Sequence, residues 1–123
     1  MYLHIGITIT EDSEVKNFYE DILGMSIERH FFLPKNLASF IFGINRKTEA
    51  YLMKRDDLLI ELFINSEISS HNFDHICLAV PDRKGLIREA QNKGYECLIK
   101  ERESSDLVFV KDKSGNIFEV KDK

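Results

Sequence analysis

LHIGITIT at residues 3–10 and FDHICLAV at residues 73–80 are the two stretches that decide the fold of this 123-residue chain. In both, apolar residues alternate with small or polar ones, which predicts a strand with one buried face, and His4 or His75 lies near its start. Later in each half a glutamate interrupts an apolar strand: Glu61 in LLIELFI (58–64) and Glu119 in GNIFEV (115–120). This order, repeated after 71 positions, indicates a duplicated unit.

Each predicted first strand is followed by a predicted helix. The first helix is expected to have Asp12 as its N-cap and to run for about three turns to Gly24. The second is expected to begin at Asp82 and to end at Gly94. The first histidine precedes Gly24 by 20 positions and the second precedes Gly94 by 19, so the halves have nearly equal spacing.

The remaining predicted elements complete a βαβββ unit in each half. Further strands are expected at residues 25–33, 50–54, 58–64, 95–100, 106–111 and 117–120. The segment 34–46, with PKNLASFIFGIN, predicts a short helix that ends at Gly43 and has no counterpart in the second half; its role is left open. We therefore predict an α+β fold of two tandem modules, at about 1–65 and 73–121, with a polar linker at about 66–72.

Composition narrows the classes of function. A formal net charge of −4 with dispersed Lys and Arg argues against nucleic acid as a partner. No apolar run approaches the ~20 residues of a membrane span, so we expect a cytoplasmic protein without a membrane partner. Cys77 and Cys97 are expected to be buried, reduced thiols rather than a disulfide.

The two histidines and two glutamates together resemble a metal-ligand set. Imidazole and carboxylate ligands suit divalent Ni, Co, Zn, Mn or Fe, and the identity of the metal is left open. Glu61 is expected to share a strand face with Leu59 and Phe63, and Glu119 with Ile117, where an unpaired charge is costly. The alternative is that the glutamates are solvated and the histidines are ordinary polar positions. Repetition of the whole pattern favours the metal site.

Three segments carry a resemblance to a known family. FYEDILGM (18–25), the predicted first strand, and FVKDKSGNIFEV (109–120), in this order and spacing, resemble the vicinal oxygen chelate superfamily, which has the glyoxalase and bleomycin-resistance fold. The resemblance covers nearly the whole chain, which we therefore treat as a single domain, 1–123. It implies that the mostly antiparallel sheets of the two modules curve into a cup-shaped surface around a divalent metal.

The resemblance also assigns site residues. The ligand positions fall on His4, Glu61, His75 and Glu119, a set similar to that of bacterial glyoxalase I. Thr8 stands where glyoxalase I has an arginine that holds the substrate, and Asn65 where it has an asparagine that contacts glutathione, so these two are candidate substrate-binding residues. Because that arginine and a basic loop after Gly94 are missing, glutathione is not the expected thiol.

The predicted function is that of a metal-dependent lyase or isomerase of the glyoxalase type. It would remove a proton next to a carbonyl through a metal-chelated enediolate, with Glu119 as first choice and Glu61 as second choice for the general base. One alternative is a small-molecule binding or drug-resistance protein without catalysis. Another is an Fe(II) dioxygenase, less favoured because four protein ligands leave only two open positions on an octahedral ion.

The expected partners are a small-molecule substrate, which the sequence does not name, and a second copy of the chain. Open sheet edges are a liability unless they are paired or covered, and the superfamily commonly covers them by dimerising. We therefore expect a homodimer. Whether each metal site lies within one chain or between two is left open.

Overall fold

The computed structural model describes residues 3–67 and 73–123. The chain divides into two compact units, Met1–Ile68 and Ser69–Lys123. Most of the linker predicted at about 66–72 lies outside the described residues. None of the helices in the described part of the chain has the length and apolar character that crossing a membrane requires.

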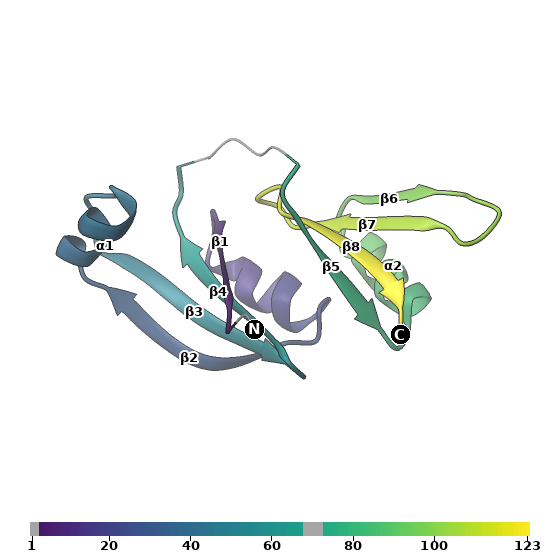
Figure 1. The fold of residues 1–123 in the computed structure, drawn as a ribbon, viewed down its shortest axis with the longest axis horizontal. Helices are drawn as coiled ribbons and strands as arrows, with labels where there is room; N and C mark the ends of the chain where they lie inside the picture. The colour runs from purple at the N-terminus through teal and green to yellow at the C-terminus, as the bar shows by residue number, and fades with distance from the viewer. Residues whose placement is uncertain (1–2, 68–72) are drawn as a thin grey trace. The chain divides into compact units, whose positions relative to one another are not determined.

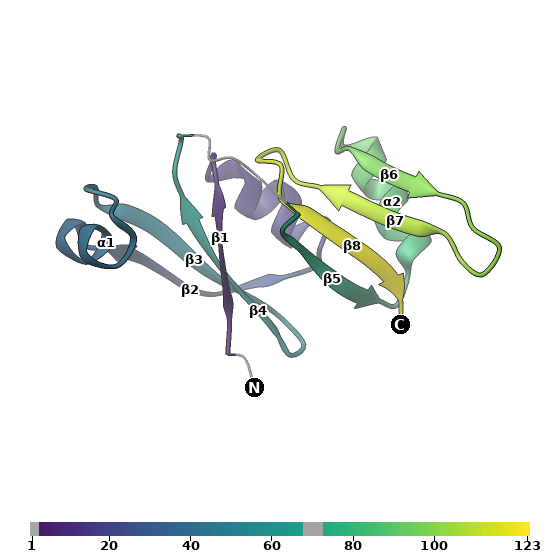
Figure 2. The ribbon, with the colours of Figure 1, turned by 45° about the horizontal axis from the view of Figure 1, so that its top comes forward.

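Each unit contains one four-stranded mixed sheet (Figures 1 and 2). The first sheet has the order β1-β4-β3-β2, and the second has the order β5-β8-β7-β6. The first strand of each unit pairs in parallel with the last, whereas the other pairs are antiparallel. The strands are β1 (Ile5–Ile9), β2 (Ser26–Leu33), β3 (Thr48–Arg55), β4 (Leu58–Ile64), β5 (His75–Val80), β6 (Cys97–Lys100), β7 (Leu107–Lys111) and β8 (Ile117–Asp122). The predicted α+β class with two tandem βαβββ modules is confirmed.

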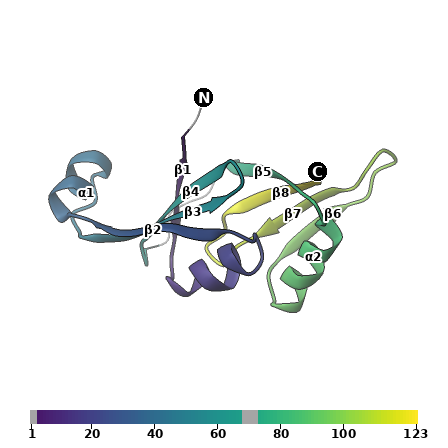
Figure 3. The same ribbon diagram turned by 90° about the horizontal axis from the view of Figure 1, so that it is seen from below.

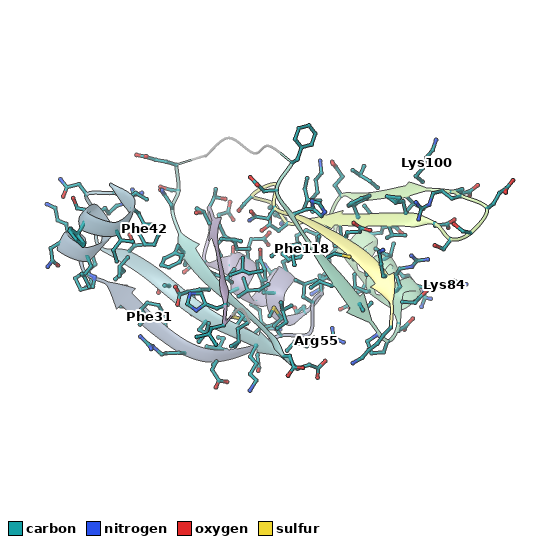
Figure 4. All side chains as sticks on the ribbon, viewed as in Figure 1. Phe31, Phe42, Arg55, Lys84, Lys100 and Phe118 are labelled. Atoms are coloured by element: carbon teal, nitrogen blue, oxygen red, sulfur yellow. The ribbon has the colours of Figure 1, made fainter. Side chains whose placement is uncertain are left out.

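A helix lies against one face of each sheet (Figure 3): η1 (Val15–Glu20) in the first unit and α2 (Arg83–Asn92) in the second. Buried side chains from the helix and the sheet form a core in each unit. In the first, Phe18 and Tyr19 of η1 are buried, as are Ile60 and Leu62 of β4. In the second, the buried residues include Leu86, Ile87 and Ala90 of α2 and Phe118 and Val120 of β8, with Phe118 labelled in Figure 4. Side chains alternate along a strand, so Glu61 and Glu119 each lie on the face of their sheet that points away from the helix and the core.

The helix of the first unit differs from the expected three-turn α-helix, and that prediction is wrong in detail. Val15–Glu20 is a π-helix, with the N–H of Asp21 bonded to the carbonyl of Lys16 at 3.0 Å and the N–H of Leu23 to that of Phe18 at 3.0 Å. Asp12 does not cap it by its side chain; its carbonyl accepts from Val15 N–H at 3.0 Å. A π turn contains one residue more than an α turn, which matches the longer spacing to Gly24.

The helix of the second unit follows its prediction. Asp82 is the N-cap, and its Oδ1 accepts a hydrogen bond from Gly85 N–H at 2.9 Å. Gly94 follows the last turn with φ +83°, a left-handed conformation that glycine adopts without steric cost. This helix is α-helical at its end, because Lys93 N–H bonds to the Glu89 carbonyl at 3.1 Å.

The segment 34–46 forms a helix that has no counterpart among the described residues of the second unit. It is α1 (Lys35–Phe42), which ends at Gly43 with φ +70°, as predicted. This helix lies between β2 and β3 in the chain, at the end of that strand pair (Figure 1). Among its residues only Ala38 is buried, whereas Phe40 is 86% exposed. The insert therefore adds an apolar surface at one end of the first sheet.

The turn before β8 is organised by a buried carboxylate. Asp112 is 4% exposed and accepts hydrogen bonds from Ser114 N–H at 3.0 Å, Asn116 N–H at 2.8 Å and Asn116 Nδ2 at 2.8 Å. Gly115 supplies the left-handed residue, with φ +89°. The D-x-x-G-N part of the family motif is thus a structural turn that sets the start of the strand carrying Glu119.

We expect Asp112→Ala to lower the apparent free energy of unfolding by about 2 kcal/mol, because three donors lose a charged acceptor. Urea denaturation followed by circular dichroism measures this change. Glu103→Ala, at an exposed position of the same unit, is the control and should change stability by less than about 0.5 kcal/mol. Equal stability of both variants would show that the turn does not depend on this carboxylate.

The cysteines are free thiols, but the prediction that both are buried is wrong. Cys77 is exposed, and Cys97 is half-buried. Cys77 lies two positions after His75 in β5 and is the register partner of Glu119. Alternation therefore places it on the same face of the sheet as these two residues, which is the face opposite the core. Burial raises the pKa of the Cys97 thiol, with a smaller contribution from the nearby Glu96 charge.

Candidate functional site

The first predicted half-site is formed within the first unit. His4 Nε2 lies 3.7 Å from Glu61 Oε1. The side chain of His4 is 47% exposed, whereas that of Glu61 is only 20% exposed. The pair therefore combines an accessible imidazole with a largely covered carboxylate.

The second half-site repeats this geometry in the second unit. His75 Nε2 lies 3.8 Å from Glu119 Oε1, and the two side chains are 47% and 20% exposed. Two pairs far apart in sequence thus agree in separation and exposure. Coincidental surface contacts have no reason to match in this way.

Strand register explains why each pair forms. Gly6 of β1 is the partner of Glu61 in β4, and Cys77 of β5 is the partner of Glu119 in β8. Each histidine stands two positions before that partner, on the same face of the sheet. Its imidazole therefore reaches diagonally along the sheet to the carboxylate.

The pairs fit the chemistry of a divalent metal. Two ligands at about 2.1 Å from one octahedral ion lie about 3 Å apart, so the observed pairs need side-chain shifts of less than about 1 Å. Within each unit, the described residues bring no third His, Cys, Asp or Glu side chain to the pair. Each unit thus supplies two nitrogen or oxygen donors, and their union into one four-ligand site stays a prediction.

A backbone carbonyl orients the imidazole of His75. Its Nδ1 lies 2.9 Å from the carbonyl oxygen of Phe73, which can only accept a hydrogen bond, so Nδ1 carries the proton. In the neutral ring the lone pair then lies on Nε2, the atom that faces Glu119. Metal-binding histidines commonly have such an orienting partner on the other ring nitrogen.

The half-site of the first unit opens into a cavity of about 350 Å³. Thr8 and Asn65, the two candidate substrate-binding residues, line this cavity together with His4 and Glu61. All four residues that the sequence assigns to this half of the site therefore share one space. The other lining residues are Gly6, Ile7, Leu33, Ala38, Phe42, Ile44, Thr48 and Phe63.

Asn65 is held in place by hydrogen bonds at the end of β4. Its side-chain oxygen accepts hydrogen bonds from the Arg46 guanidinium and, at 3.0 Å, from the backbone N–H of Glu67. Its backbone N–H donates to the Ile9 carbonyl at 2.8 Å. Arg46 belongs to the segment 34–46, so the insert is tied to the end of β4. Asn65 therefore has a structural role whether or not it contacts a substrate.

The surroundings of Glu119 are more highly charged. Lys121 Nζ lies 3.8 Å from Glu119 Oε2. A cavity of about 300 Å³ beside Glu119 includes Arg83, Arg102 and Lys121 in its lining. The two half-sites are therefore alike in their candidate ligands and different in the residues that surround them.

The sequence reasoning missed the apolar walls of the first cavity. Phe42 and Ile44 come from the insert, and Phe42 is labelled on α1 in Figure 4. The Phe42 and Phe63 rings lie 5.5 Å apart, although 21 positions separate them. The available signal was the insert itself, because an addition to only one copy of a duplicated unit breaks the repeat next to the ligand residues.

Comparison with known proteins agrees with the fold. A family model described as Glyoxalase/Bleomycin resistance protein/Dioxygenase superfamily matches residues 2–120. No curated protein matches the chain in sequence. Among solved structures, a glyoxalase family protein from Enterococcus faecalis is 18% identical with a TM-score of 0.73, and the match covers 98% of this chain and 95% of that one.

Two further structures have the same fold. The trypanothione-dependent glyoxalase I of Leishmania major is 23% identical with a TM-score of 0.73, covering 99% of this chain and 86% of that one. The other is a Glu-to-Gln variant of the fosfomycin resistance protein FosX from Listeria monocytogenes, complexed with Mn(II) and 1S,2S-dihydroxypropylphosphonic acid. It is 12% identical with a TM-score of 0.78, and the match covers 100% of this chain and 92% of that one.

Identities this low show a shared fold alone, whereas the family model spans almost the entire chain. The paired strands, the repeated βαβββ order and the duplicated His–Glu pairs agree with that match. The chain therefore belongs to the glyoxalase/bleomycin resistance protein/dioxygenase superfamily.

Proposed function

We propose that this protein is a metal-dependent lyase or isomerase of the glyoxalase type, which moves a proton next to a carbonyl of a small molecule. In this proposal His4, Glu61, His75 and Glu119 hold one divalent ion, from the two pairs of one chain or of two. A divalent ion held by these residues would supply Lewis acidity toward the carbonyl of the substrate. The observation that carries the proposal is the equal geometry of the two His–Glu pairs, 3.7 and 3.8 Å.

Residues of the chain would transfer the proton, orient a histidine and exclude water. Glu119 accepts the proton at a carboxylate oxygen and returns it, and Glu61 is the second choice for this role. The Phe73 carbonyl keeps the proton of His75 on Nδ1 and so holds that ring in one orientation. Lining residues of the first cavity, Thr8 among them, exclude water from the substrate on that side.

Exchange of a substrate proton with solvent tests the proposed reaction directly. Wild-type protein loaded with Ni²⁺, Co²⁺, Zn²⁺, Mn²⁺ or Fe²⁺ is incubated in deuterated water with hemithioacetals, α-hydroxy and α-keto thioesters, and methyl-branched acyl thioesters. We expect deuterium to enter the carbon next to the carbonyl of at least one compound, as measured by NMR. Protein stripped of metal by a chelator should give no exchange above the buffer rate.

The same experiment separates the catalyst from the two alternatives. Tight binding of a compound without exchange in any metal form would favour the small-molecule binding or resistance protein. Consumption of O₂ with an Fe²⁺-loaded sample would favour the dioxygenase. The cavity of the first unit suits a substrate or a sequestered ligand equally well, whereas the duplicated set of His and Glu donors favours the enzyme.

We further propose that the protein is a homodimer. Each sheet has two edge strands in the described part of the chain: β1 and β2 in the first, β5 and β6 in the second. Edges of this kind are usually covered by pairing or packing. Light scattering at micromolar concentration should give about twice the 14.3 kDa mass of one chain. A mass equal to that of one chain would contradict the proposal.

A further inference from the structure

The cavity of the first unit is bounded on one side by an apolar socket, formed by Leu33, Ala38, Phe42, Ile44 and Phe63. The Phe42 and Phe63 rings lie 5.5 Å apart with their planes inclined by 57°, so together they form a corner rather than a closed stack. Phe42 is 53% exposed, so its ring is accessible to solvent. A face of this kind gains free energy when an apolar group covers it.

The socket lies directly beside the His4–Glu61 pair. A Cβ added to Gly6 would lie 3.3 Å from Phe63 Cε2, which shows that the Phe63 ring leans over the bare backbone of β1. Gly6 is the register partner of Glu61. The ring and the carboxylate therefore meet at the same position of the sheet, and a small molecule can contact both.

No Lys or Arg is among the described residues that line this cavity. Arg46 is engaged with the Asn65 side chain, and the Thr48 hydroxyl donates to the Arg46 carbonyl at 3.0 Å. These polar groups hold the insert in place. A charged substituent entering the socket would lose hydration without gaining a partner of opposite sign.

Size limits the ligand as well. A volume of about 350 Å³ is near the lower end for small-molecule sites, which suits one aromatic ring or a short branched chain together with its oxygen atoms. In the described part of the second unit no helix corresponds to α1, and three cationic and three acidic side chains line its cavity. Selectivity for an apolar group is thus a property of the first unit.

We propose that the apolar socket binds an uncharged apolar arm of the substrate, an aromatic ring or short branched alkyl group, next to the oxygens held at His4 and Glu61. The substrate class is then a small α-oxygenated carbonyl compound with an apolar arm rather than one with a peptide or phosphonate arm. The position of the oxygens rests on the proposed function. Recognition of the arm rests on the socket alone.

Three hydroxamates that share the same pair of oxygens test this proposal, with binding measured by calorimetry on Zn²⁺-loaded protein. Benzohydroxamate should bind about tenfold or more tightly than acetohydroxamate, because its ring fills the socket. 4-Carboxybenzohydroxamate should bind at least about tenfold more weakly than benzohydroxamate, because its carboxylate finds no cation there. Equal affinities, tighter binding of the carboxylated compound, or no binding by any of the three would overturn the proposal.

Two phenylalanines of the same helix provide matched variants. Phe42→Ala should reduce the preference for benzohydroxamate over acetohydroxamate to less than about threefold, because Phe42 lines the socket. Phe40→Ala should leave the preference unchanged, because Phe40 is 86% exposed and does not line the cavity. Equal effects of the two substitutions would contradict the assigned socket.

Failure of the arm proposal and failure of the proposed reaction give different results. If deuterium enters methyl-armed and phenyl-armed substrates equally well, and Phe42→Ala changes neither, the reaction stands and the socket proposal falls. If the hydroxamate preference depends on Phe42 but no compound exchanges a proton, the socket stands as a binding site and the proposed reaction falls.

Discussion

Glu119→Gln is expected to lower turnover of a true substrate by ~10²–10⁴-fold while substrate binding survives. Glutamine keeps the shape of the side chain and a neutral oxygen ligand, but it cannot accept the proton. The loss should therefore appear in kcat, and deuterium exchange into the carbon next to the carbonyl should disappear. Metal content measured on the same sample shows whether the ion is retained.

Glu61→Gln is the matched variant, because Glu61 has the same exposure and nearly the same distance to its histidine. If Glu119 is the base, Glu61→Gln should keep measurable exchange under conditions where Glu119→Gln has none. The reverse result would move the role of base to Glu61. Equal exchange by both variants and by metal-stripped protein would exclude a role for either carboxylate in proton transfer.

His75→Ala is expected to weaken binding of Zn²⁺ and Ni²⁺ by at least about 10²-fold. Mutation of a residue that only orients a metal ligand typically lowers metal affinity by about 10–100-fold, so removal of a ligand itself should lower it at least as much. Competition with a chromophoric chelator measures the affinity, and total metal analysis gives the stoichiometry. One ion per chain in the wild type is expected if the two pairs join, whereas separate half-sites would hold two.

His30→Ala controls for removal of any histidine near a glutamate. His30 Nε2 lies 2.8 Å from Glu49 Oε2, closer than in either half-site, and its ring stacks on Tyr51 with centroids 4.2 Å apart. Among the described residues of the second unit that pair has no copy, and we expect its loss to leave metal affinity unchanged. A comparable loss in both variants would show that binding is nonspecific. His4→Ala should match His75→Ala if the two pairs share one ion.

The sequence was sufficient for the fold class and for each His–Glu pair, because both depend on short-range alternation that is visible twice. Alternation places His4 and Gly6 on one face, and Gly6 pairs with Glu61. The same alternation would have placed Cys77 on the open face beside His75. The general tendency of cysteine to be buried was given too much weight there, and the local pattern was the better guide.

The apolar socket could not be predicted in the same way. It depends on a contact between Phe42 of α1 and Phe63 of β4. No repeated sequence pattern connects these two segments. The π-helix was also hidden, because Val15, Phe18 and Tyr19 fit an apolar helical face in either helix type. The two helix types are distinguished here by hydrogen bonds: the N–H groups of Asp21 and Leu23 each donate to a carbonyl five residues earlier in the chain.

The π turn of η1 has a consequence for how this chain tolerates insertions. The first half has one residue more than the second between its histidine and its helix-ending glycine. An extra residue within β1 or β4 would reverse the faces of the residues on one side of it, and a side chain of the His–Glu pair would then point into the core. In the helix the extra residue widens one turn, and the flanking strands keep their alternation. We therefore expect changes of length to be tolerated in the helices and loops of this duplicated protein, and not in the strands that carry its two His–Glu pairs.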